Sequence, residues 1–120
     1  MIKYGKGDKK KCIVLHSKII RSAGECRLCG KSYYPQLDCA HLISRRFNAT
    51  VSDLRNGVCL CKTCHWRTGI FADEMGSLIE DTIGWDVYQE IKELAQSKAK
   101  VNWKEELERL TKVALDLKVL

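Results

Sequence analysis

The stretch "NGVCLCKTCHWRTGIF", residues 56–71, decides the fold of this chain. Its opening Asn-Gly pair is a turn signal, and the apolar residues that follow are typical of a short strand. Cys61 and Cys64 come next as a C-x-x-C pair. We therefore predict a strand within residues 51–61 and a helix that begins in residues 62–71, with the cysteine pair at the junction.

A second C-x-x-C pair, Cys26 and Cys29, lies earlier in the chain, with a loop of 31 residues between the pairs. Each pair can form a tight knuckle that turns two thiolates toward one ion, and four thiolates complete a tetrahedral zinc shell. Gly30 supplies the flexible backbone position that the first knuckle needs. The intervening loop is longer than in a simple zinc ribbon, so we expect further structure inside it. We predict one structural Zn²⁺ per chain, held by Cys26, Cys29, Cys61 and Cys64.

The thiols are expected to be reduced. The first residues, "MIKYGKGDKKKC", lack the apolar stretch of a signal peptide, and no apolar run is long enough to cross a membrane. We therefore expect a cytoplasmic protein without a membrane partner, in which metal binding is favoured over disulfides. The three other cysteines, Cys12, Cys39 and Cys59, are interpreted as small buried hydrophobic residues.

Positive charge is concentrated early in the chain, whose 120 residues carry a net charge of +6. Residues 1–31 have nine basic and two acidic side chains, and residues 32–70 have five and two. Residues 71–120 have seven basic and eleven acidic side chains. The first 70 residues are therefore suited to a polyanion such as nucleic acid, and the tail is not. The length allows one domain with a modest core.

The segments outside the opening stretch predict both helix and strand. Residues 12–22 place apolar side chains near one helical face, and Gly24 ends that helix. The basic residues 1–11 before it are expected to be mobile. Residues 33–43 predict a strand that Pro35 interrupts.

The tail after residue 70 has a helical pattern. A helix in residues 73–83 is expected to stop at Gly84, and Asp86 can cap a second helix in residues 87–96. A third helix carries an apolar stripe that is expected to pack on its own domain. The residues of this stripe are Trp103, Leu107, Leu110, Ala114 and Leu117.

His41 ends the short apolar run "LDCAH". The residues alone leave three interpretations open for it, namely a buried structural histidine, a zinc ligand and a catalytic base. Zinc ligation is disfavoured because four thiolates already close the zinc shell. His16 lies in the apolar stripe of the first predicted helix, where a structural role is favoured.

Together these positions resemble the zinc-bearing HNH endonucleases of the ββα-metal fold. The family's order of His, Asn and His falls on His41, Asn56 and His65. The chain is most similar to the phage NinG/Rap recombination nucleases, whose D-x-x-H-x-x-S-R pattern is matched from Asp38 to Arg45 and whose helical tail is similar. The resemblance implies an α+β fold, with a small zinc-stabilised ββα-metal core, an N-terminal helix and a C-terminal helical extension.

The expected domain organisation follows from this resemblance. Residues 1–24 form a basic segment and a helix, and residues 25–70 form the zinc-bound HNH core. Residues 71–120 form the helical extension, which packs on the core to give one compact domain.

The resemblance also implies roles for the site residues. His41 is the general base that deprotonates the attacking water, and an imidazole with a pKa near 7 suits that task. His65 is a ligand of the catalytic divalent ion, with zinc ligation or helix capping as its alternatives. Asn56 holds the loop between His41 and the second strand through its amide. Many relatives carry a metal ligand immediately before the base, and some carry another four residues after the second histidine. This chain has Ala40 and Gly69 there.

Asp38 lies on the same face of the predicted strand as Ala40. We predict that it is the second ligand of the catalytic ion, and the alternative is a bond to a backbone amide. One imidazole, one carboxylate and several waters suit Mg²⁺ or Mn²⁺ better than a second zinc.

Arg45 is predicted to contact a phosphate oxygen and to stabilise the transition state. For Trp66, packing against the tail is favoured over stacking on a base. Four further side chains are predicted to add nucleic-acid affinity, namely Arg46, Arg55, Lys62 and Arg67.

Two hypotheses of different classes follow. The first is a metal-dependent DNA endonuclease that acts on branched recombination intermediates and is of phage or prophage origin. The second is a zinc-stabilised nucleic-acid-binding module without catalysis, which the absence of ligands at Ala40 and Gly69 keeps open. The presence of His41 and His65 together with Arg45 favours the enzyme. The sequence leaves open whether the chain forms a homodimer.

Overall fold

The computed structural model describes residues 7–32 and 37–120. This part of the chain forms five helices and one two-stranded sheet, which is the predicted α+β class. Strand β1 (Leu37–Ala40) pairs antiparallel with β2 (Val58–Cys61), with Leu37 opposite Cys61 and Ala40 opposite Val58. The first four residues of the strand predicted in residues 33–43 lie outside the described residues, and β1 ends one residue before His41.

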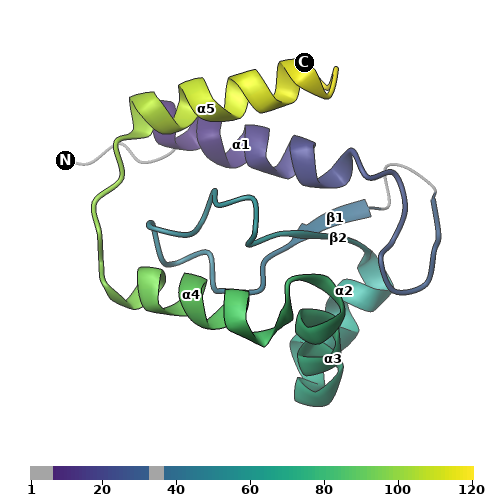
Figure 1. Cartoon of the computed structure of the whole chain (residues 1–120). Coiled ribbons are helices and arrows are strands. Elements are labelled where there is room, and N and C mark those ends of the chain that lie inside the picture. Colours follow the sequence, from purple (N-terminus) through teal and green to yellow (C-terminus); the bar gives the residue numbers. More distant parts are fainter. Residues whose placement is uncertain (1–6, 33–36) are drawn as a thin grey trace.

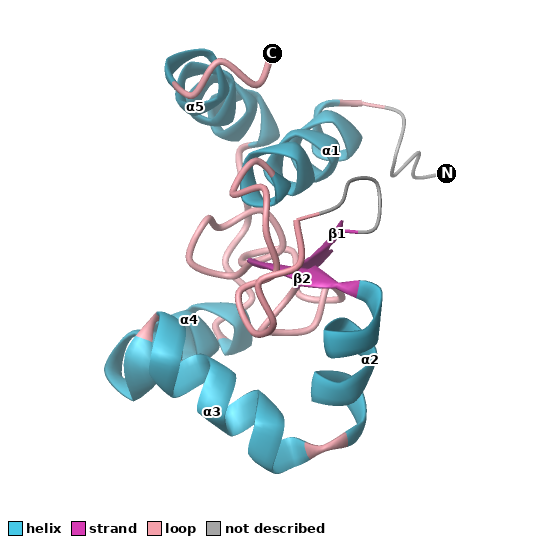
Figure 2. Ribbon diagram, turned by 90° about the vertical axis from the view of Figure 1, so that its right-hand side faces the viewer, coloured by secondary structure: helices cyan, strands magenta, loops and turns pink. Residues whose placement is uncertain are grey.

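The helices lie on both sides of the β ribbon (Figure 1, Figure 2). Helices α1 (Asp8–Arg21) and α5 (Trp103–Asp116) pack against each other on one side. On the other side lie α2 (Lys62–Ile70), α3 (Ala72–Thr82) and α4 (Gly84–Gln96). The ββα unit formed by β1, β2 and α2 therefore has the N-terminal helix and the helical extension packed around it.

In the part of the chain that the structure describes, three clusters of buried side chains hold these layers together. The first joins the β ribbon to α3 and includes Leu60 and Leu78, both fully buried. The second lies between α1 and α5, where Cys12 and Leu110 are fully buried. The third joins α4 to the loop after β1. Burial of one apolar face is the main source of stability for short amphipathic helices such as α1, α3, α4 and α5.

Two helix starts differ from the prediction, and each has a local cause. Residues 8–11, predicted to be mobile, form the first turn of α1, where the charge of Asp8 is favourable at the helix N-terminus. Helix α4 begins at Gly84, so Asp86 lies in its first turn and caps nothing. Gly84 has φ +80°, a conformation that favours glycine, and it makes the break between α3 and α4.

Candidate functional site

The two C-x-x-C pairs meet at one end of the β ribbon. The four cysteine sulfur atoms lie within 4.8 Å of one another, and Cys29 Sγ is 3.6 Å from Cys61 Sγ. This spacing is close to that of thiolates in a tetrahedral shell with Zn–S bonds of about 2.3 Å. The cluster fits a structural zinc site, as the sequence predicted.

The backbone of each pair positions its thiols. The Cys26 amide donates to the Lys31 carbonyl at 2.7 Å, and Gly30, with φ +77°, donates to the Cys26 carbonyl at 2.9 Å. Burial acts to raise the pKa of Cys26, but hydrogen bonds from neighbouring amides outweigh it and lower the pKa to about 6. Burial and the neighbouring thiols raise the pKa of Cys64. Zinc binding to such a cluster releases protons, because its ligands are thiolates and not thiols.

The loop between the strands, residues 41–57, is held by Asn56, which is fully buried. Its Oδ1 accepts from the amides of Leu42 and Ile43 at 2.8 and 2.7 Å. Its Nδ2 donates to the carbonyls of Ile43 and Thr50 at 3.2 and 2.9 Å. Both donor hydrogens and both lone pairs of the amide are therefore used within the loop. These are the loop contacts that the resemblance implies, and they fix the backbone directly after His41.

His41 follows β1 and has one ring nitrogen engaged. Its Nε2 lies 2.9 Å from the Val51 carbonyl and must donate to it, which leaves the lone pair on Nδ1. Nδ1 is shielded from solvent and has no hydrogen-bond partner among the described residues. Burial, together with the charges of Arg45 and His65, lowers the pKa of His41 below its ordinary value despite the bond to Val51. His41 is therefore neutral at neutral pH.

Asp38 on β1 faces His65 in the first turns of α2. Asp38 Oδ2 lies 2.9 Å from His65 Nδ1, and Asp38 Oδ1 lies 2.9 Å from Lys62 Nζ. Burial acts to raise the pKa of Asp38, but the hydrogen bonds from His65 and Lys62 outweigh it and hold the pKa below its usual range. A cation that binds between Asp38 and His65 would replace the hydrogen bond between them, with a deprotonated His65 Nδ1 and Asp38 Oδ2 as neighbouring ligand atoms.

Asp38, His41 and His65 line the same open groove, which has a volume of about 510 Å³. Helix α2 links this groove to the cysteine cluster, because Cys64 belongs to the cluster and the next residue is His65. The fold therefore lets a zinc ion fix the helix that brings His65 to Asp38. The remaining residues of the groove are Lys62, Trp66, Thr68, Gly69, Ile70 and Met75.

The prediction that Trp66 packs against the tail is wrong. Trp66 lies on the groove side of α2, and the residue is 61% exposed. Its ring is perpendicular to the neighbouring Phe71 ring, with centroids 6.5 Å apart. A helix of nine residues whose other face already packs on β1, β2 and α3 has no buried position left for this side chain.

The side chains predicted to bind phosphate fall into two groups. Arg45 and Arg46 are exposed in the loop after His41, and no carboxylate among the described residues forms an ion pair with either of them. The other three side chains already form ion pairs within the protein. To bind DNA, each would have to exchange its carboxylate partner for a phosphate. These pairs are Arg55 with Asp53 and Glu90, Lys62 with Asp38, and Arg67 with Glu74.

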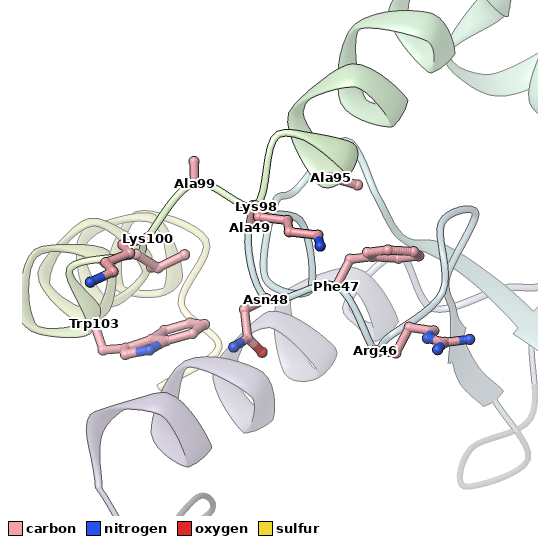
Figure 3. A pocket seen from close by; sticks show the side chains of 10 residues that line it. Arg46, Phe47, Asn48, Ala49, Ala95, Lys98, Ala99, Lys100 and Trp103 are labelled. Atoms are coloured by element: carbon pink, nitrogen blue, oxygen red, sulfur yellow. The ribbon is translucent and has the colours of Figure 1, made fainter.

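Arg46 also borders a second hollow, of about 550 Å³, which shares no lining residue with the groove (Figure 3). This hollow lies between the loop, the end of α4 and the start of α5. Its charged side chains are Arg46, Lys98 and Lys100, and its aromatic side chains are Phe47 and Trp103. Sequence reasoning missed it because segments about fifty positions apart in the chain build it, and no local pattern connects them.

Comparison with known proteins supports the central part of this description. Residues 26–71 match a family model described as HNH endonuclease. The matched residues include both cysteine pairs, His41, Asn56 and His65. Neither the curated proteins nor the solved structures gave a match to the chain. Among the described residues, none of the helices has the length and apolar character needed to span a membrane. The match implies a nuclease-type domain and a nucleic-acid substrate.

Proposed function

We propose that this chain is a metal-dependent DNA endonuclease whose active site is the groove lined by Asp38, His41 and His65. Phosphodiester hydrolysis needs a deprotonated water and a cation that neutralises the charge on the leaving oxygen. The observation that carries the proposal is that one groove holds a group suited to each need. A neutral histidine lies beside an imidazole–carboxylate pair, within the stretch that matches HNH endonucleases.

His41 is the general base of this proposal. The Val51 carbonyl holds Nε2–H at 2.9 Å, so Nδ1 is the nitrogen that can take up the proton of the attacking water. Nδ1 is shielded from solvent in the free protein, so this step requires the water to reach it when the substrate binds. The same carbonyl then stabilises the imidazolium that forms. Arg45, exposed and without a carboxylate partner among the described residues, is placed in the following loop to contact a phosphate oxygen.

Asp38 and His65 are the proposed ligands of the catalytic cation. A carboxylate and an imidazole at 2.9 Å, open to solvent on the groove side, fit a hard divalent ion that keeps several waters. Mg²⁺ or Mn²⁺ bound there would supply the Lewis acid that neutralises the leaving oxygen. Lys62 shares the Asp38 carboxylate in this structure and would be displaced from it by the cation.

Asp38→Asn tests whether the Asp38 carboxylate binds the catalytic cation. The variant keeps the size of the side chain but removes the charge, so we expect the Mg²⁺ concentration for half-maximal cleavage to rise about 10–100-fold. Mn²⁺, which accepts nitrogen ligands more readily, should rescue the variant in part. Metal titrations of the cleavage rate measure both effects.

Asp81→Asn is the matched control for this test. Asp81 is an exposed carboxylate on α3 that pairs with Arg27 and does not line the groove. Its titration curve should superimpose on that of the unchanged protein. If the curve of Asp38→Asn superimposes as well, Asp38 is no ligand.

The substrate class in this proposal is branched DNA, and the support comes from the resemblance to the NinG/Rap recombination nucleases. A phage or prophage origin and a place in the cell interior belong to the same hypothesis. The hollow around Phe47 and Trp103 has three cations and no acidic side chain among the described residues that line it, and it offers a second surface for DNA. The mass of the protein in solution decides between a monomer and a homodimer.

A cleavage assay tests the proposed function directly. A synthetic four-way junction and a linear duplex of the same sequence are incubated with Mg²⁺ or Mn²⁺, and with EDTA in place of the metal. We expect cleavage that needs the added metal and that is faster on the junction. Binding to both DNAs without cleavage would favour the alternative, a zinc-stabilised binding module. Equal cleavage of both would keep the nuclease and remove the preference for branches.

A further inference from the structure

Three metal-binding side chains meet on the face of β1 that is turned toward α1. His16 lies on α1, Cys39 lies on β1, and His41 follows β1. One ligand atom from each residue lies within 4.8 Å of the other two. His16 Nδ1 is 3.7 Å from Cys39 Sγ, and the centroids of the two imidazole rings are 5.1 Å apart. Neither His16 nor Cys39 has a part in the hydrolysis proposed above.

Both imidazoles are held in the tautomer that a metal ion requires. His16 Nε2 donates to the Asp53 carbonyl at 2.9 Å, and His41 Nε2 donates to the Val51 carbonyl at 2.9 Å. In each ring the lone pair is therefore on Nδ1. Histidines that bind metals usually donate their other N–H to a carbonyl or carboxylate in this way, which fixes the ring.

Two features of this cluster favour a ligand: one ring nitrogen lacks a hydrogen bond among the described residues, and the backbone at Gly57 lies close to one of the rings. Among the described residues, His41 Nδ1 is shielded from solvent and has no hydrogen-bond partner, which is uncommon for a buried nitrogen. His16 is fully buried, and a Cβ at Gly57 would come within 3.1 Å of its ring. The glycine thus lets β2 approach the histidine closely. The donors are held in place by the fold, as a preformed site requires.

We propose that His16, Cys39 and His41 form a second metal site, selective for Zn²⁺, whose occupation switches off cleavage. Two imidazole nitrogens and one thiolate are a zinc donor set, and the fourth tetrahedral position is left to a water. The distance of 3.7 Å between His16 and Cys39 is already near the N···S separation of about 3.5 Å in such a shell. The other separations shorten through small side-chain rotations. Mg²⁺ and Mn²⁺ prefer oxygen ligands and do not compete for this site.

Zn²⁺ at this site would block catalysis because it binds the nitrogen that the base uses, His41 Nδ1. The lone pair of His41 Nδ1 cannot bind Zn²⁺ and accept a proton from water at the same time. Zn²⁺ at this site therefore inhibits without displacing the catalytic cation, and a higher Mg²⁺ concentration does not relieve the inhibition. This regulatory half of the inference rests on the proposed function, whereas the metal site itself does not.

Metal analysis tests the site. The unchanged protein, Cys39→Ser and Cys12→Ser are equilibrated with buffered free Zn²⁺ in the micromolar range, and bound zinc is measured per chain. Cys12 is the matched control because it is a buried thiol one turn before His16 on α1, and serine can still donate to the Trp103 carbonyl. We expect two ions in the unchanged protein and in Cys12→Ser, but one in Cys39→Ser.

One ion in the unchanged protein, or two in Cys39→Ser, would overturn the site. A Co²⁺ titration of the unchanged protein answers the question even if a variant does not fold. The first equivalent should develop the absorption of a four-thiolate site, and the second should add a weaker band from a single thiolate. A second equivalent without any new band would also overturn the site.

Inhibition is measured separately, as the cleavage rate at saturating Mg²⁺ with increasing Zn²⁺. We expect more than a tenfold loss of rate in the unchanged protein, independent of the Mg²⁺ concentration. The inhibition constant should rise at least tenfold in Cys39→Ser, with each protein compared with its own rate before Zn²⁺ is added. A second zinc without any cleavage under any condition refutes the proposed function alone. Cleavage that continues with the second zinc bound refutes the regulation.

Discussion

His41→Ala lowers the cleavage rate about 10²–10⁴-fold, the usual contribution of a general base, while folding and DNA affinity stay unchanged. The base is needed only when water attacks, so its loss affects the chemical step and leaves binding intact. Among the described residues, the side chain hydrogen-bonds to the Val51 carbonyl alone, and Asn56 holds the loop backbone without it. Single-turnover cleavage at saturating Mg²⁺, fluorescence anisotropy on the same DNA and thermal unfolding measure the three quantities.

The pH profile separates a base from a merely structural histidine. Burial lowers the pKa of His41 below the ordinary value of about 6.5. The active form is the deprotonated one, so the rate of the unchanged protein should rise with pH on the acid side and be level at neutral pH. His41→Ala should lose this acid limb.

His65→Ala is the comparison variant, because its effect should be a raised Mg²⁺ requirement. If His41→Ala cleaves within tenfold of the normal rate, His41 is not the base.

Local patterns in the sequence were sufficient to predict the cysteine cluster and the junction of β2 and α2. C-x-x-C spacing constrains its own backbone, so the cysteine cluster could be predicted from residues that are neighbours in sequence. The turn signal at Asn56 and the apolar run after it similarly placed β2 and α2. The resemblance, and not a local pattern, placed His41 and His65 in one site, and in the structure both side chains line one groove.

Pairings between distant segments could not be predicted. Nothing local shows that Lys62 shares Asp38 with His65, or that Arg67 is held by Glu74. The same is true of His16, which is 25 positions before His41 and whose ring lies 5.1 Å from it only because α1 packs on β1. The tertiary fold determines which carboxylates a long, flexible basic side chain can reach. For this reason some of the side chains predicted to bind phosphate are instead paired within the protein.

The cysteine cluster and the groove are connected through α2 and the paired strands. Helix α2 starts at the cluster, where Cys61 Sγ accepts from the Cys64 amide at 3.4 Å. The strand that ends at Cys61 pairs with β1, which carries Asp38 and leads into His41. A change in the cluster is therefore expected to alter the positions of Asp38 and His65, which the paired strands and α2 carry.

Cys64→Ser should release the zinc and unfold the ββα unit. A structural zinc site contributes about 10–16 kcal/mol at neutral pH, and the whole stability of a small domain is about 5–15 kcal/mol. Loss of one thiolate therefore removes more than the remaining core can supply. We expect less than one zinc per chain and no cooperative unfolding transition at the temperature where the unchanged protein melts. The buried cluster between α1 and α5 is separate, so part of the helical circular dichroism should persist. Cys12→Ser, which removes a buried thiol outside the cluster, should keep its zinc and its transition. A folded Cys64→Ser protein without zinc would show that the four cysteines do not hold the fold together.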